Sequence, residues 1–286
     1  MRPGLRGTAF IAVGLALSLA LQGVLGCGSS SNGGETEAGI DAAFEAAPAT
    51  DGDLPEADAG RDAADARKDV VIPATSYCAG LVPKPKFCDD FDDGDLTADW
   101  DQSTVLAPSV IDLDDALYTS APLSFFVGAK VVAQGSSGNA SLRKTVLGNV
   151  SHVSLAFSAR YTTTTIATGL VAIATLDVSL NHYFTLYLRD GDAVAPAAVL
   201  EEQAAGVMTR HVLKKLPPAA TWTRVVIDLD LVAGRANVSF GAQKALDAEP
   251  ITALVGTEAT IRVGAVYVYG PTDPFEARID DVVLDF

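Results

Sequence analysis

The chain has 286 residues, of which 49% are hydrophobic and 7% aromatic, and its formal net charge is −16 with a pI ≈ 4.4. A chain of this length and apolar content can bury the core of one large domain or two small ones. The negative charge argues against nucleic acid as a partner, because an acidic protein repels a polyanion. It suits solubility, cation binding or contact with neutral sugars.

Residues 1–26 have the pattern of a bacterial secretion signal. Two arginines precede an apolar segment, 10–24, that is shorter than the roughly 20 residues a membrane-spanning helix needs. The segment ends in Val-Leu-Gly-Cys, which resembles the lipobox of bacterial lipoproteins. The resemblance implies cleavage before Cys27, acylation of Cys27 and a membrane anchor made of lipid. Gly28, where Asp often marks inner-membrane retention, favours the outer membrane of the cell envelope; the alternative is a simple secretory signal or an uncleaved anchor.

Residues 27–72 are expected to form a disordered tether. Behind the cysteine comes a Gly/Ser-rich run, and from 28 to 72 eleven acidic residues stand against three basic ones, with Phe44 as the only aromatic. Such a segment cannot bury enough apolar surface to offset its chain entropy. The tether therefore serves as a solvated acidic spacer, with a binding tail as the alternative.

Residues 73–286 are expected to form one all-β domain. Short segments of alternating or β-branched residues are separated by turn signals such as Gly148-Asn149 and Gly270-Pro271, which is typical of a sandwich or barrel. Residues 196–205 begin with proline and precede Gly206, as a helix would, but they follow a hairpin pattern and are interpreted as a strand. The expected strands are 108–114, 123–127, 150–162, 165–180, 182–188, 196–205, 222–232, 236–240, 261–269 and 275–286.

The remaining cysteines, Cys78 and Cys88, are expected to form a disulfide, because the lipobox places the domain outside the cytoplasm. The three histidines, His152, His182 and His211, have no metal-ligand spacing. They are interpreted as surface or satisfied strand residues.

Three segments resemble the concanavalin A-like lectin/glucanase jelly rolls, which include laminin-G-like domains. They are the opening Phe-Cys-Asp-Asp-Phe-Asp-Asp-Gly-Asp at 87–95 with Trp100, the Trp–strand–Gly turn–strand hairpin at 221–240, and the closing Ile-Asp-Asp-Val-Val-Leu-Asp-Phe at 279–286. The resemblance implies a sandwich of two antiparallel sheets with the first and last strands adjacent. The family includes lectins, laminarinases and peptide-binding modules, so the fold alone does not select a function.

The sequence also indicates a calcium site. Along 275–286 the apolar residues alternate with polar ones, and this alternation shifts by one position at Asp280-Asp281, which predicts a bulge. Gathered carboxylates are the ligands that Ca²⁺ prefers, and many relatives in the resembled family hold a structural Ca²⁺ between the chain's first and last strands. The alternative is acidic decoration of a sheet edge. The candidate ligands are Asp89, Asp90, Asp92, Asp280 and Asp281.

The glucanases of the resembled family carry a Glu-x-Asp-x-Glu motif, and this sequence has none. We therefore expect a non-catalytic, membrane-anchored module that binds carbohydrate or an envelope partner. The alternatives are a glycan hydrolase or lyase with a non-standard site, and a purely structural envelope lipoprotein. Tyrosines at strand spacing are candidates for stacking on sugars: Tyr183, Tyr187, Tyr267 and Tyr269.

Overall fold

The computed structural model describes residues 76–130, 132–133, 135–162, 169–189, 198–215, 217–270 and 274–286. The expected signal peptide, the tether and Cys27 lie outside these residues. Chain contacts divide the protein at Asp62, and every described residue belongs to the unit that follows, Ala63–Phe286. Within these ranges, no helix has the length and apolar character to cross a membrane.

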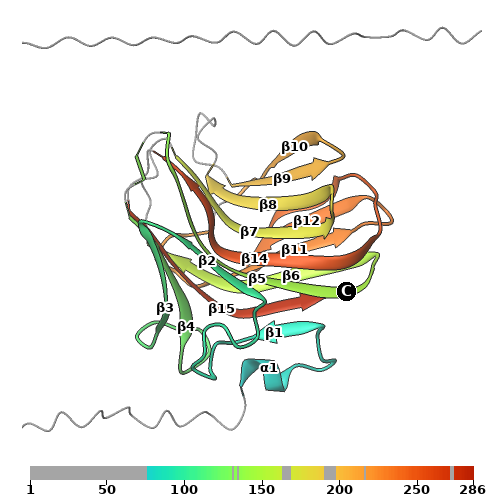
Figure 1. Cartoon of the computed structure of the whole chain (residues 1–286). Coiled ribbons are helices and arrows are strands. Elements are labelled where there is room, and N and C mark those ends of the chain that lie inside the picture. Colours follow the sequence, from blue (N-terminus) through green and yellow to red (C-terminus); the bar gives the residue numbers. More distant parts are fainter. Residues whose placement is uncertain are drawn as a thin grey trace, which may run out of the picture. The chain divides into compact units, whose positions relative to one another are not determined.

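Two antiparallel sheets face each other across a shared core, which confirms the all-β sandwich (Figure 1). The seven-stranded sheet, nearer the viewer in Figure 1, has the order β10-β9-β8-β7-β14-β5-β2. The eight-stranded sheet has the order β13-β12-β11-β6-β15-β4-β3, and β1 also pairs with β15. The elements are α1 (Tyr77–Gly80), β1 (Phe87–Asp89), β2 (Gln102–Leu106), β3 (Ser109–Asp114), β4 (Ser124–Ala129), β5 (Ser137–Val150), β6 (His152–Tyr161), β7 (Leu170–Ser179), β8 (His182–Arg189), β9 (Val199–Ala204), β10 (Val207–Val212), β11 (Thr223–Asp230), β12 (Arg235–Phe240), β13 (Gln243–Pro250), β14 (Gly256–Tyr269) and β15 (Phe275–Asp285).

The alternation of residue types explains why these segments form strands around one core. In β11 every second residue is buried, beginning with Thr223 and ending with Leu229. A strand with this period turns its apolar residues to one sheet face and its polar residues to the other. The core between the sheets includes Phe125, Leu155, Phe157, Phe184, Leu186 and Ile227, all essentially inaccessible to solvent.

The first and last strands are neighbours, as the family resemblance implied. β15 carries a bulge at Asp281, which has φ 53°, and its register with β6 shifts there. Up to Ile279 one edge of β15 pairs with β4, and from Val282 onward β1 pairs with β15. The bulge predicted at Asp280-Asp281 is confirmed, and it marks the point where two partner strands meet on the same strand.

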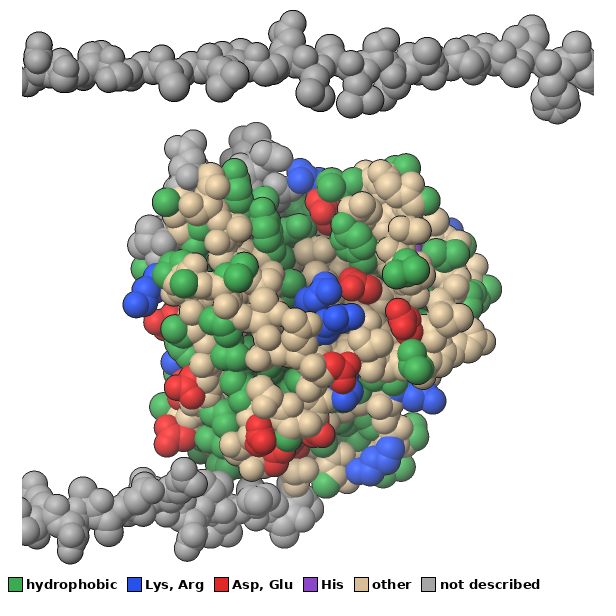
Figure 2. All heavy atoms as spheres, in the orientation of Figure 1, with side chains coloured by type: hydrophobic (Ala, Val, Ile, Leu, Met, Phe, Trp, Pro, Cys, Tyr) green, Lys and Arg blue, Asp and Glu red, His purple; other side chains and the backbone are tan. Residues whose placement is uncertain are grey.

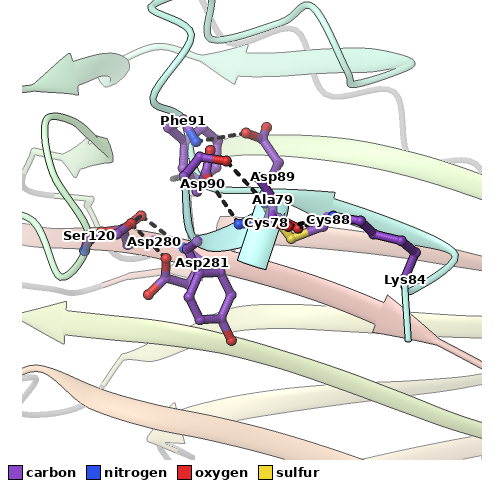
Figure 3. Close-up of a disulfide and its surroundings, with 12 residues drawn as sticks. Cys78, Ala79, Lys84, Cys88, Asp89, Asp90, Phe91, Ser120, Asp280 and Asp281 are labelled. Atoms are coloured by element: carbon purple, nitrogen blue, oxygen red, sulfur yellow. Dashed lines mark hydrogen bonds between the residues drawn. A yellow bond between two sulfur atoms is a disulfide. The ribbon is translucent and has the colours of Figure 1, made fainter. Parts of the chain in front are cut away.

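A disulfide joins Cys78 to Cys88 and ties α1 to the start of β1 (Figure 3). It confirms the predicted pairing. Trp100 then covers this segment, with its ring edge-on to Phe87 at 5.0 Å and parallel to the ring of Phe91 at 6.3 Å. The entry of the chain into the sandwich is therefore held by a covalent link and by aromatic contacts.

The predicted strand 196–205 is present as β9, whereas the turn predicted at Gly148-Asn149 is wrong. Both residues lie inside β5, which sequence patterning did not predict. A Cβ on Gly148 would approach the ring of Phe286 to 2.6 Å, so the glycine makes room for an aromatic ring rather than for a reversal of the chain. Strands β2, β10 and β13 were also absent from the prediction.

Candidate functional site

The outer face of the seven-stranded sheet carries the four predicted tyrosines. Tyr183 and Tyr187 lie on β8, and Tyr267 and Tyr269 lie on β14. Strand β7 separates β8 from β14, and its Ala172 is the register partner of both Tyr187 and Tyr267. Tyrosines from segments far apart in the sequence therefore belong to one surface.

Tyr267 and Tyr269 offer open aromatic rings. Their side chains are 39% and 38% exposed, and their rings lie parallel with centroids 6.2 Å apart. Ala172 between Tyr267 and Tyr187 is fully buried, although it is not part of the core between the sheets. A small residue flanked by two tyrosines gives this face an apolar, aromatic patch.

A row of polar side chains crosses the sheet beside the tyrosines. Each member is the register partner of the next on the neighbouring strand, so the row runs perpendicular to the strands. Neighbouring strands are about 4.8 Å apart. The members of this polar row, in order from β2 to β10, are Gln102, Arg143, Arg262, Thr175, Thr185, Glu201 and Arg210.

Charged groups of the polar row are held by specific contacts. The Nε of Arg210 donates to Glu201 at 3.1 Å, and the carboxylate is almost buried. Arg262 lies 3.5 Å from Asp177 of β7. Burial raises the pKa of Asp177 above its usual value, and the guanidinium of Arg262 opposes that rise. Figure 2 shows basic and acidic side chains together near the centre of this face.

Two tyrosine hydroxyls on this face are kept neutral. Burial, followed by the carboxylate of Glu201, raises the pKa of Tyr187 and of Tyr183. The hydroxyl of Tyr183 donates to the side chain of Gln203. The oxygen of Tyr183 can therefore accept a hydrogen bond from a sugar hydroxyl, the neutral phenol of Tyr187 can donate one, and both rings provide apolar contact.

The predicted calcium ligands divide into two groups, Asp89, Asp90 and Asp92 at and after the end of β1, and Asp280 and Asp281 at the bulge of β15; Figure 3 shows Asp89, Asp90, Asp280 and Asp281. All five accept hydrogen bonds. Asp90 accepts from the backbone N–H of Cys78 at 2.9 Å, Asp92 from that of Leu123 at 3.4 Å, and Asp281 from the hydroxyl of Ser120 at 2.7 Å. Asp89 accepts hydrogen bonds from the backbone of Phe91 and the indole of Trp100. Asp280 accepts from the backbone N–H groups of Thr119 and Ser120 at 2.7 and 3.0 Å. These contacts orient the loops around the acidic cluster.

The other three predicted ligands, Asp90, Asp92 and Asp281, influence one another electrostatically. Burial and then Asp90 raise the pKa of Asp92 to about 6, and Asp281 adds to the rise. Asp92 is 4% exposed, and its Oδ2 has no hydrogen-bond partner in the described part of the chain. Among the described residues, no group of three or more His, Cys, Asp or Glu side chains is already arranged to hold a metal ion.

Sequence patterning missed a buried histidine cluster on strands β8, β9 and β10 of the seven-stranded sheet. His182 and His211 are both buried, and both approach Glu202 of β9. The Nε2 of His182 is 2.9 Å from Oε1 of Glu202, and the Nε2 of His211 is 3.5 Å from Oε2. The backbone N–H of Thr252 also donates to Glu202 at 2.7 Å. The expectation of surface or satisfied strand histidines fits His152, which pairs with Asp228, and His182 and His211, which lie on strands beside Glu202. It did not include that the latter two share one buried carboxylate.

Sequence patterning also missed Arg143, Arg262 and Thr175. Each occupies a strand position that looks like an ordinary solvent-facing residue in its own segment. Only the order of β5, β14 and β7 in the sheet brings them into one row.

The sequence matches no protein-family model and no curated protein. Its fold is similar to that of an endo-β-1,4-glucuronan lyase from the fungus Trichoderma reesei, with a TM-score of 0.50 and 12% identity over 70% of this chain and 95% of the lyase. It is equally similar to the cellulose-induced protein Cip1, with a TM-score of 0.50 and 11% identity over 69% and 96% of the two chains. Both similarities concern the fold.

Proposed function

We propose that this protein is a carbohydrate-binding module that holds its ligand on the outer face of the seven-stranded sheet. The observation that carries the proposal is the joint placement of Tyr183, Tyr187, Tyr267 and Tyr269 with the polar row on one face. Sugar rings present apolar faces that stack on aromatic rings and hydroxyl edges that form hydrogen bonds, and this face supplies both. The similarity in fold to a glucuronan lyase and a cellulose-induced protein supports a glycan as the ligand class.

A glycan array followed by a degradation assay on the purified protein tests this function. We expect binding without products, because the sequence lacks the paired acids of the resembled glucanases. Binding with new reducing or unsaturated ends would instead favour a hydrolase or lyase. Absence of binding on the array and of products in the degradation assay, together with an envelope protein that copurifies, would favour a structural lipoprotein.

The module is proposed to be anchored in the cell envelope, at the outer membrane, through lipid on Cys27. The lipobox-like Val-Leu-Gly-Cys sequence supports this, and more than one acyl chain is needed for stable anchoring. Intact-mass analysis of protein extracted from membranes should give a chain that starts at Cys27 and carries acyl chains. A soluble product, or one cut elsewhere, would contradict the anchor.

A structural Ca²⁺ ion is proposed at Asp90, Asp92 and Asp281, with Asp89 and Asp280 orienting the surrounding loops. The support is the buried, unpartnered Oδ2 of Asp92 among neighbouring carboxylates. Their hard oxygens match the preference of Ca²⁺, and the ion would neutralise charges that repel one another.

Stability should then depend on pH and calcium together. The folded pKa of Asp92 is raised to about 6 and that of Asp280 to about 7. Without Ca²⁺ these two carboxyl groups therefore stabilise the fold most below their unfolded pKa of about 4, and their contribution is lost as the pH rises from there through 6 to 7. Millimolar Ca²⁺ should raise the melting temperature at pH 8 and change it little at pH 5.

Asp92→Asn should remove this calcium effect and should stabilise the calcium-free protein at pH 8. The exposed Asp115→Asn is the matched control and should leave both properties unchanged. Absence of a calcium-induced shift at pH 8 in the parent protein would contradict the calcium site and leave acidic edge decoration as the explanation.

A further inference from the structure

We propose that the polar row contains a subsite for the carboxylate of an acidic sugar, formed by Arg143 and Arg262 with the hydroxyl of Thr175. This inference rests on the proposed function and names the ligand class as a polysaccharide that contains uronic acid. It departs from the neutral sugars that the net charge alone favoured.

Two arginines stand directly opposite each other on neighbouring strands. Arg143 of β5 and Arg262 of β14 are register partners, and their positions place both side chains on the outer face. Like charges at directly opposed positions of a sheet destabilise it. Within the described ranges, the carboxylate at ion-pair distance from this pair is that of Asp177, which contacts Arg262 at 3.5 Å; Arg143 also lowers the pKa of Asp177, so one carboxylate faces two guanidinium groups. The arrangement therefore leaves positive charge that an anion would compensate.

Two buried polar atoms of this subsite lack partners. The Nε of Arg143 and the Oγ1 of Thr175 are inaccessible to solvent and form no hydrogen bond within the described residues. Thr175 is 7% exposed and is the register partner of Arg262, so its side chain belongs to the same row. A buried donor without a partner is costly, and a bound carboxylate would accept from both the guanidinium and the hydroxyl.

The position of the arginine pair relative to the tyrosines suits a sugar chain. The polar row crosses the strands from Gln102 to Arg210, and the tyrosines lie alongside it on β8 and β14. A polysaccharide lying across the strands can stack one ring on a tyrosine while a neighbouring residue places its carboxylate at Arg143. The pair thus adds selectivity for an acidic residue to a surface that otherwise binds sugar rings.

The protein as a whole is acidic, so nonspecific electrostatic attraction cannot explain binding of an acidic glycan. A chain with a net charge of −16 repels polyanions at long range, so binding of an acidic glycan requires local contacts. Half of that excess charge lies in residues 28–72, outside the described residues. Affinity for an acidic glycan should therefore depend on individual arginines.

Calorimetric titration with two matched probes tests the subsite. The probes are a β-1,4-linked oligoglucuronate and the same oligosaccharide with its carboxyl groups reduced to alcohols. We expect the acidic probe to bind about tenfold to hundredfold more tightly than the reduced probe, the range for hydrogen bonds to a charged group. Arg143→Gln should remove that preference, because it lowers the affinity for the acidic probe far more than the affinity for the reduced probe. Added salt should weaken the acidic probe selectively.

Arg160→Gln is the matched control. Arg160 lies on β6 of the other sheet, opposite Arg278, and its removal should change neither affinity. Equal affinity of the parent protein for the two probes, or an unchanged preference in Arg143→Gln, would overturn the acidic subsite but leave the glycan-binding face intact. Failure of both probes to bind would overturn the subsite, and absence of binding on the glycan array as well would overturn the proposed function.

Discussion

Replacing Glu202 with alanine is expected to lower the free energy of unfolding by about 3 kcal/mol or more. The substitution leaves the buried His182 and the backbone N–H of Thr252 without an acceptor, and it removes the negative charge beside His211. Breaking a buried charged network by deleting one partner typically costs about 3–5 kcal/mol. For a domain of this size that corresponds to a fall in melting temperature of roughly 6–20 °C, measured by calorimetry or circular dichroism.

Glu249→Ala provides the control for this cluster. Glu249 is 3.5 Å from the other ring nitrogen of His211, but its side chain is largely solvent-accessible, so its removal should cost less than about 1 kcal/mol. Equal effects of the two substitutions would contradict a buried network centred on Glu202.

The Glu202 network should also have a characteristic pH dependence. Burial disfavours ionisation of Glu202, but hydrogen bonds from Thr252 and His182 outweigh burial and hold the pKa of Glu202 below its usual value. A carboxylate with a depressed pKa stabilises the folded state above its unfolded pKa, about 4.3, and loses that contribution as pH falls through the folded pKa. The stability difference between the parent protein and Glu202→Gln should therefore shrink below about pH 4.

The double substitution Tyr187→Ala and Tyr267→Ala is expected to reduce glycan affinity about hundredfold. These tyrosines flank Ala172 and form the aromatic patch of the outer face. Truncation of an aromatic binding residue commonly costs about 1–2 kcal/mol or more, so the pair accounts for roughly two orders of magnitude. Affinity electrophoresis or calorimetry with the glycan identified on the array measures the loss.

Tyr118→Ala is the control that distinguishes loss of the tyrosine patch from a general effect of removing an exposed tyrosine. Tyr118 is 41% exposed, close to the value for Tyr267, but it lies in the segment between β3 and β4 of the other sheet. It should retain full affinity. The single Tyr267→Ala variant tests the patch without disturbing the less exposed Tyr187. Normal affinity in the double variant, with an unchanged melting curve, would contradict the tyrosine face.

The strand pattern and the closing bulge were predictable because they depend on local periodicity. The alternation of Phe275, Ala277 and Ile279 reverses to Val282 and Leu284, and only a bulge keeps both sets in the core. Strand β5 was not predictable in the same way. Its glycines resemble turn signals, whereas Gly148 is required by the ring of Phe286, which comes from the other end of the chain.

The candidate site was predictable only within single strands. A period of two placed Tyr183 with Tyr187 and Tyr267 with Tyr269, but it could not show that β7 brings the two pairs together. Arg143 and Arg262 carry no motif, and they become a pair only through the register of β5 with β14. Likewise, nothing local in the sequence indicates that His182 and His211 share Glu202.

NMR chemical-shift mapping with the bound oligosaccharide tests the central proposal, a glycan-binding outer face on the seven-stranded sheet, most directly. We expect the largest amide shift changes in β7, β8 and β14, around Ala172, Tyr187 and Tyr267. The outer face of the other sheet provides the contrast, because a hollow lined by Asp228, Asn237 and Lys244 lies there. Shift changes concentrated at that hollow, with β8 and β14 unaffected at saturation, would contradict the proposal.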